Sequence, residues 1–286
     1  MPYAHPEYLI SAAELGADPA SRRILDATVF LTPAPTTGYR AESGRERFDA
    51  GHIPGALFLD LIRDASDTST GLGFSLPPVA QLEALFRRLG ISNDTEVVLY
   101  STGHIMWATR AWWLLHYCGQ GRVRVLDGGM QAWRDHGLPI TTDRASYPRG
   151  DFTANPNPAL FVDKNGVLAA IGDADVCTVN ALSPEIHAGE GDFSYGRKGH
   201  IAGSLNVYYD DLLESGHFKD HDALAEVLEA KGLLAAPQVI AYCGGGISAT
   251  IDAFACLLCG KQEVAVYDGS MSEWVRDESL PMATGR

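Results

Sequence analysis

The chain has 286 residues, of which 46% are hydrophobic and 20% are charged, and its formal net charge is −14 at pH 7. The length allows one large domain or two domains of ordinary size. The hydrophobic and charged contents are ordinary for a soluble globular protein. The acidic balance argues against partners such as nucleic acid or an anionic membrane, but a local positive pocket could still hold a small anionic substrate. No apolar run reaches the length of a membrane span, and the N-terminus has no signal-peptide pattern.

Short apolar runs rich in β-branched residues alternate with stretches of helical periodicity along the chain. A glycine stands at or just after the end of each predicted helix, where a C-terminal cap is expected. Continuously apolar strands between helices are typical of a parallel sheet that is covered on both faces, so the fold class is α/β. The predicted strands are 23–30, 96–100, 123–127, 176–180, 238–242 and 264–268, and the predicted helices are 79–90, 104–118, 222–232 and 247–259.

Four segments recur in the same order in both halves of the chain. They are 23–27 and 176–180, 51–56 and 199–204, 97–101 and 239–243, and 125–130 and 266–271. A repeat of this length indicates tandem domains rather than a solenoid. Ser101 stands in the first copy where the second copy has Cys243, so only the second copy carries a nucleophilic thiol.

The stretch 141–160 holds three prolines and two asparagines without helical or strand period, as expected of a domain boundary. We therefore predict a non-catalytic N-terminal domain over 1–145, a linker over 146–160 and a catalytic C-terminal domain over 161–286. Residues 32–47 also have a loop-like composition.

The five cysteines are an odd number without disulfide-framework spacing, and the nine histidines form no metal-ligand pattern. We expect a reduced, cytoplasmic protein without a bound metal. His52 and His200 recur at equivalent places in both copies, and so do Asp127 and Asp268, which favours structural roles for all four.

The segment Cys243-Gly244-Gly245-Gly246-Ile247-Ser248 joins a predicted strand to a predicted helix. Glycines allow the backbone N–H groups of a tight loop to turn inward around one point, and the following helix N-terminus adds partial positive charge. A cysteine at the edge of such a cradle is expected to react as the thiolate. The segment therefore predicts a nucleophilic Cys243 beside an anion-binding loop, Gly244 to Ser248.

With these features the chain resembles the two-domain rhodanese-type sulfurtransferases, which include thiosulfate and 3-mercaptopyruvate sulfurtransferases. The Gly-His-Ile segments of both halves, the loop that begins at Cys243 and the Asp-Gly-Gly/Ser-x-x-x-Trp segments carry the resemblance. It implies two tandem rhodanese-like domains, each a parallel five-stranded sheet flanked by helices. It also implies a persulfide on Cys243, a sulfur donor and a thiophilic acceptor such as cyanide or a thiol, and no metal or organic cofactor.

Three departures from the family pattern bear on the donor. Thiosulfate enzymes usually carry basic residues directly after the cysteine, where this chain has Gly244 and Gly245. Mercaptopyruvate enzymes usually have serine at the position of Gly245, and both groups usually have arginine at the position of Leu182. The loss of two mercaptopyruvate-type side chains favours thiosulfate. Arg197 is the first candidate for the cation that holds the donor, and the arginines at 40, 45 and 47 are the second.

Two other functions explain part of this pattern. A non-catalytic sulfur carrier or binding module would also need the glycine cradle, so an assay has to separate it from an enzyme. A phosphatase of the related cysteine-loop type would need a Cys-x5-Arg loop, but the sixth residue after Cys243 is Ala249. The sequence leaves the oligomeric state, the acceptor and the pathway open.

Overall fold

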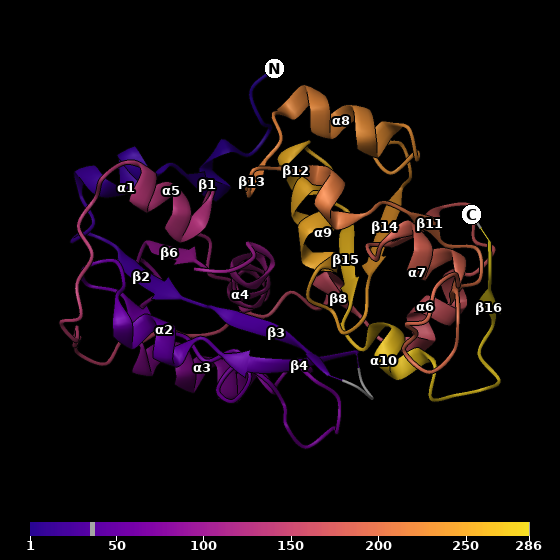
Figure 1. Ribbon diagram of the computed structural model, residues 1–286, viewed down its shortest axis with the longest axis horizontal. Coiled ribbons are helices and arrows are strands. Elements are labelled where there is room, and N and C mark those ends of the chain that lie inside the picture. The colour runs from indigo at the N-terminus through magenta and orange to yellow at the C-terminus, as the bar shows by residue number, and fades with distance from the viewer. Residues whose placement is uncertain (35–37, 286) are drawn as a thin grey trace.

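Two α/β units follow one another in the computed structural model, which describes residues 1–34 and 38–285 (Figure 1). The described elements of the first unit are η1 (Pro6–Tyr8), β1 (Leu9–Ile10), α1 (Ala12–Ala17), β2 (Arg23–Asp26), β3 (Val29–Ala34), β4 (Gly38–Ser43), α2 (Arg45–Ala50), β5 (Leu57–Phe58), α3 (Val79–Arg88), β6 (Val97–Tyr100), α4 (Met106–Tyr117), β7 (Val123–Leu126) and α5 (Gly129–Asp135). The short 3-10 helix η2 (Pro158–Leu160) follows at the end of the linker.

The second unit repeats the alternation of strands and helices. Its elements are β8 (Phe161–Val162), α6 (Lys164–Ala170), β9 (Val176–Asn180), α7 (Pro184–Ala188), β10 (His200–Ile201), β11 (Leu205–Asn206), η3 (Tyr209–Leu212), β12 (Leu213–Glu214), β13 (His217–Phe218), α8 (His221–Glu229), β14 (Gln238–Tyr242), α9 (Ala249–Leu258), β15 (Val264–Tyr267), α10 (Ser270–Trp274) and β16 (Met282–Ala283). No helix of the described chain is long and apolar enough to cross a membrane.

Each unit is built on a parallel five-stranded sheet, as predicted. The strand order is β1-β7-β6-β2-β5 in the first sheet and β8-β15-β14-β9-β11 in the second, so equivalent strands occupy equivalent places. All the pairings within both sheets are parallel. The central strands β6 and β14 carry buried side chains on both faces because helices cover both sides.

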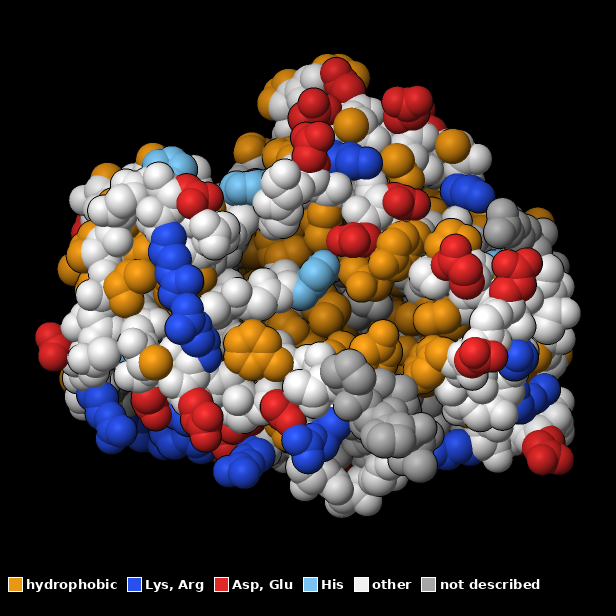
Figure 2. Space-filling view, in the orientation of Figure 1, with side chains coloured by type: hydrophobic (Ala, Val, Ile, Leu, Met, Phe, Trp, Pro, Cys, Tyr) orange, Lys and Arg blue, Asp and Glu red, His pale blue; other side chains and the backbone are white. Residues whose placement is uncertain are grey.

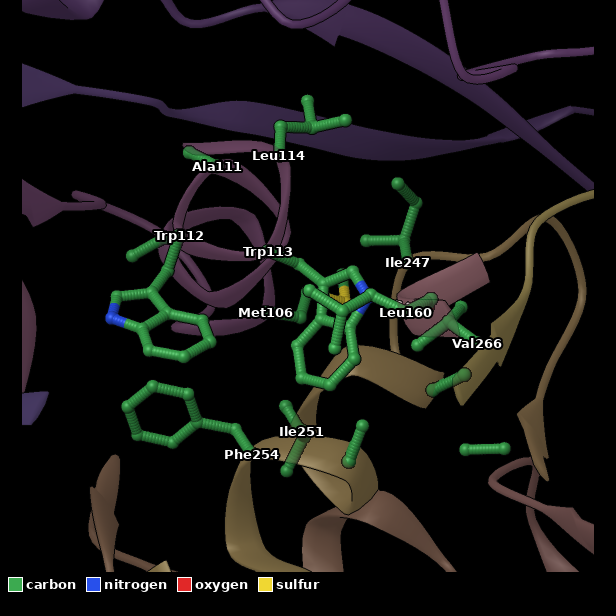
Figure 3. Close-up of a cluster of buried hydrophobic side chains, with 14 of the residues drawn as sticks. Met106, Ala111, Trp112, Trp113, Leu114, Leu160, Ile247, Ile251, Phe254 and Val266 are labelled. Atoms are coloured by element: carbon green, nitrogen blue, oxygen red, sulfur yellow. Dashed lines mark hydrogen bonds between the residues drawn. The ribbon is translucent and has the colours of Figure 1, made fainter. Parts of the chain in front are cut away.

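The two units meet through equivalent helices, α4 and α9, which pack against each other. The hydroxyls of Thr109 on α4 and Thr250 on α9 lie 2.7 Å apart, and these two residues are counterparts in the repeat. Figure 3 shows Trp112 of α4 beside Phe254 of α9, with ring centroids 4.9 Å apart. The contact between the units is therefore a shared apolar core rather than a hydrated gap, and the tryptophans of α4 belong to it.

The predicted helices are found with small shifts of their ends, and glycines 90, 119, 232 and 260 close them in left-handed conformations, as expected. The loop-like interpretation of residues 32–47 is wrong. Strands β3 and β4 form an antiparallel hairpin there, and α2 begins at Arg45. The composition suggested a loop because a hairpin is held by backbone hydrogen bonds and needs no run of buried side chains. Leu31 is 43% exposed and Tyr39 is 53% exposed.

The ends of each unit are tied to the rest of the molecule. The N–H of Ala4 donates to the carbonyl of Leu258 at the end of α9, and the hydroxyl of Tyr3 donates to the carbonyl of Lys219. In the linker, Phe152 is fully buried against Phe86 of the first unit. Most residues of the linker are exposed, and Phe152 and Leu160 are the buried ones in 141–160. The domain limits at 145, 160 and 161 remain predictions.

Candidate active site

Cys243 stands at the carboxyl end of β14, the central strand of the second sheet. Its side chain is 2% exposed, and β9 and β15 flank it on either side. Ligand sites of parallel sheets lie outside the carboxyl ends of the strands, so this is the position at which a site is expected. The chain then forms the loop 243–248 and enters α9 at Ala249.

The segment Asp268 to Ser272 holds this loop in place. The Ser270 hydroxyl accepts the N–H groups of Cys243 and Gly246, both at 3.1 Å, and donates to the carbonyl of Tyr267 at 2.7 Å. The Gly244 carbonyl accepts both the N–H and the hydroxyl of Ser272, at 2.8 and 2.7 Å. Ser270 adopts a left-handed backbone (φ 48°) that is unfavourable for a serine, and its three hydrogen bonds account for its presence there.

Several N–H groups of the loop are left without a protein acceptor. In the described chain, the N–H groups of Gly244, Gly245, Ile247 and Ser248 make no hydrogen bond to a protein atom. They lie between a buried thiol and the N-terminus of the ten-residue helix α9. Free backbone N–H groups in this setting can bind an anion or a negatively charged sulfur.

Two glycines of the loop differ in the space that a side chain would have. Gly246 has a left-handed backbone (φ 71°), and a Cβ there would lie 2.6 Å from the carbonyl oxygen of Asp268. A Cβ on Gly245 would meet nothing closer than 3.8 Å, so a side chain fits at that position. The serine that mercaptopyruvate enzymes carry there is therefore absent for a reason other than space.

Arg110, from the first unit, contacts this loop from the side of that unit, and no sequence motif indicates the contact. Its guanidinium donates to the Gly246 carbonyl at 3.2 Å, to the Phe74 carbonyl at 2.6 Å and to the Asp268 carboxylate at 2.7 Å. The other oxygen of Asp268 accepts the N–H of Leu76 at 2.7 Å. The loop therefore rests on the first unit, which supplies one wall of the site.

In the equivalent region of the first unit Ser101 replaces the thiol, and within the described residues no base is hydrogen-bonded to its hydroxyl. Ser101 is 2% exposed, and its hydroxyl accepts the N–H of Gly103 at 3.1 Å. Asp127, the counterpart of Asp268, accepts the N–H of Phe218 from the second unit at 3.0 Å. Each unit thus uses its repeated aspartate to hold a loop of the other, in agreement with the structural role expected from the repeat.

The repeated histidines also have structural contacts. His52 hydrogen-bonds through Nδ1 to the carbonyl of Phe48 at 2.8 Å and stacks on the ring of that residue. His200 hydrogen-bonds through Nδ1 to the carbonyl of His187 at 2.7 Å and stacks on its ring, with centroids 3.7 Å apart. Both side chains are therefore committed to local packing.

The other cysteines lie in environments that disfavour the thiolate. Burial raises the pKa of the Cys118 thiol to about 12 and that of Cys259 to about 11, and it raises the pKa of Cys177 and Cys256 as well. None of the four stands at a glycine loop. No group of three or more potential metal ligands occurs within the described residues.

The proposed cation Arg197 is placed near the end of α10. Its Nη1 donates to the carbonyls of Asp277 and Leu280, at 3.1 and 3.0 Å. Its other guanidinium nitrogens have no acceptor in the part of the chain that the structure describes. Leu182, where an arginine was expected by resemblance, is buried. A role of Arg197 toward a donor stays a prediction.

Figure 2 shows that hydrophobic side chains gather in a hollow between the two halves on this face of the molecule. The Cys243 loop itself lies where the two units are in contact. Gly245 faces the Gly73 carbonyl, and the Gly246 carbonyl accepts a hydrogen bond from Arg110. Fold and site together define a duplicated α/β protein with one cysteine loop at the interface between its copies.

Comparison with known proteins agrees with this class. The rhodanese-like domain family matches residues 39–136 and 189–277. A probable 3-mercaptopyruvate sulfurtransferase of Pseudomonas aeruginosa is 36% identical over 85% of this chain and 87% of its own length. The putative thiosulfate sulfurtransferase SseB of Mycobacterium tuberculosis is 35% identical over 99% of both chains.

Among solved structures, SseA from Escherichia coli, described as a 3-mercaptopyruvate sulfotransferase with the rhodanese fold, superimposes with a TM-score of 0.80 at 29% identity. The alignment covers 93% of this chain and 99% of that one. The chain belongs to the rhodanese family and contains two copies of its domain.

Proposed function

We propose that this sulfurtransferase carries the transferred sulfur as a persulfide on Cys243. The thiolate attacks the outer sulfur of thiosulfate; a new S–S bond forms, the old one breaks, and its electron pair leaves with sulfite. A thiophilic acceptor then attacks the outer sulfur of the persulfide and regenerates the thiolate, as in covalent nucleophilic catalysis. With cyanide as the acceptor the product is thiocyanate, and with a thiolate it is a new persulfide.

The observation that carries the proposal is the set of free N–H groups around a buried thiol. Gly244, Gly245, Ile247 and Ser248 keep their donors uncommitted within the described chain, while the Ser270 hydroxyl fixes the loop from behind. Such a preorganised cradle stabilises the negative charge that develops on the outer sulfur of the persulfide. The second unit thus provides the nucleophile, and the first unit provides a wall.

Thiosulfate is the proposed donor, and 3-mercaptopyruvate is the second candidate. The open space at Gly245 supports this order, because mercaptopyruvate enzymes usually carry a serine side chain at that position. The departing sulfite needs a cation, for which Arg197 is the candidate with uncommitted guanidinium nitrogens. Arg197→Ala should lower kcat/KM roughly 30- to 1000-fold, on the order of 2–4 kcal/mol. A decrease in kcat/KM of less than about threefold would show that another residue provides the cation.

Intact-mass analysis tests the chemistry directly. The protein is incubated with thiosulfate or with 3-mercaptopyruvate, and cyanide is added afterwards. We expect the mass to rise by one sulfur atom and to return to its starting value with cyanide. Cys243→Ser should gain no sulfur, whereas the control Cys118→Ser should behave like the wild type. Sulfur uptake by Cys243→Ser would contradict the assignment, and uptake without transfer to any acceptor would favour a carrier.

We also propose that the protein works in the cytoplasm, which is supported by the free thiols of all five cysteines.

A further inference from the structure

We propose that the hydroxyl of Tyr195 binds the sulfur donor. The Tyr195 side chain occupies the space that a side chain at position 244 would otherwise fill. The inference rests on the proposed function and adds a substrate-binding residue to it. Tyr195 lies between α7 and β10, outside the cysteine loop, and no sequence motif marks it.

The contact between Tyr195 and Gly244 is very close. A Cβ built on Gly244 would overlap the Oη, Cζ and Cε1 atoms of the Tyr195 ring. The backbone of Gly244 is not left-handed, so its conformation does not itself require glycine. The tyrosine ring is therefore what excludes a side chain at this position. Thiosulfate enzymes of the family usually place a basic side chain here, and this chain places a phenol hydroxyl in the same space.

The hydroxyl is available to a ligand. In the described part of the chain, the Tyr195 oxygen has no hydrogen-bond partner. Some side-chain polar atoms of the described chain are both buried from solvent and without a hydrogen-bond partner, for example in Asp252 and Asn180. The Tyr195 oxygen is not among them, and the residue is half-buried, so its hydroxyl is open to solvent. Burial, and after it the charge of Cys243, raises the pKa of this phenol, so it remains a neutral donor at working pH.

Neighbouring contacts hold the ring in position. Phe193 packs edge-on against Tyr195 with centroids 5.1 Å apart, and Tyr39 of β4 packs edge-on against Phe193 at 5.8 Å. Two residues after Tyr195, the bonds of Arg197 to the carbonyls of Asp277 and Leu280 anchor the same segment. Tyr39 of the first unit thus supports the phenol through Phe193, and the segment cannot move away without losing these contacts.

The chemical consequence is a neutral hydrogen bond where relatives of the thiosulfate class use a cation. A phenol O–H next to the nucleophile can donate to an oxygen of the donor or to the sulfur that is being transferred. A hydrogen bond to a charged acceptor is among the stronger ones in proteins. Binding through it depends less on ionic strength than binding through an exposed cation would.

Tyr195→Phe keeps the ring and removes only the hydroxyl. We expect kcat/KM for the donor to fall about 10- to 100-fold, with the same loss in the single-turnover rate of sulfur uptake measured by intact mass. The reaction of a preformed persulfide with cyanide should change less. Tyr147→Phe is the matched control, since its hydroxyl bonds to the Gly55 carbonyl in the first unit; it should leave both rates unchanged.

A loss below threefold in Tyr195→Phe, with wild-type uptake intact, overturns this inference and leaves the persulfide proposal standing. A wild type that takes up no sulfur from either donor overturns both.

A second measurement tests the geometry independently of activity. Gly244→Ala should lower the free energy of unfolding in the wild-type background, because its methyl group meets the Tyr195 ring. In a Tyr195→Ala background the same substitution should cost little, since the obstacle is gone. An equal loss in both backgrounds would show that the ring does not occupy this space, and the inference would fall.

Discussion

Replacing Arg110 by methionine should destabilise the protein and disturb the cysteine loop together. The guanidinium is almost fully buried, with 1% of its side chain exposed, and it joins Phe74, Gly246 and Asp268. Removing one partner of a buried ion pair costs about 3–5 kcal/mol. Asp268 is 17% exposed and keeps its bond from the Leu76 N–H, which places the expected loss at the lower end, about 3 kcal/mol.

The assay is urea-induced unfolding combined with a double-mutant cycle. A loss of about 3 kcal/mol corresponds to a decrease in Tm of roughly 5 °C for a chain of this length. Asp268→Asn should also destabilise, because it leaves the buried guanidinium without its counter-charge. The loss in free energy of unfolding of the double variant should be about 2 kcal/mol smaller than the sum of the two single losses. The reason is that the double variant leaves neither the guanidinium nor the carboxylate buried without its partner. kcat/KM of Arg110→Met should fall as well, because Gly246 loses its anchor.

The exposed pair Arg88–Asp64 is the matched control. Its side chains are 56% and 44% exposed, and the equivalent substitutions should change the free energy of unfolding by about 0–1 kcal/mol. If the Arg110–Asp268 coupling were no larger than the coupling of this surface pair, the claim that a buried bridge ties the loop to the first unit would be refuted.

Ser101→Ala should leave turnover unchanged, because the Ser101 hydroxyl has no base to activate it; a large loss in steady-state assays would give the first unit a chemical role. Gly246→Ala should lower activity at least tenfold, since its methyl group would meet the Asp268 carbonyl in a left-handed backbone, whereas Gly245→Ala should be tolerated. Equal activities for the two variants would contradict the loop geometry. Burial raises the pKa of Asp252 well above its ordinary value. A carboxyl whose pKa is raised by folding contributes stability that is complete below about pH 4 and is lost as the pH rises through the folded-state pKa. Asp252→Asn should therefore raise the free energy of unfolding at neutral pH and change it little near pH 4; denaturant titrations that show no pH dependence of this difference would disprove the assignment.

The elements that sequence patterns predicted correctly are those whose side chains are buried periodically. The strand ending at Tyr242 and the helix beginning at Ala249 are mostly apolar and almost entirely buried, and the glycines between them indicated the turn. The β3–β4 hairpin was missed because its stability resides in backbone pairing, which leaves no hydrophobic pattern. Arg110 and Tyr195 were missed for a different reason. Each acts on the loop from a distant part of the chain, and neither spacing nor composition indicates a contact made only by packing.

The two ends of the first unit are both held by the second: the linker leads into it, and the N-terminal segment is bonded to it through Tyr3 and Ala4. Together with the shared core of α4 and α9, these ties should hold the two units together without the covalent connection once the chain has folded. A single cut in the linker, whether by a protease or by division of the gene, should yield two fragments that remain associated as a working heterodimer. The molecule is then equivalent to a dimer whose subunits happen to share one polypeptide.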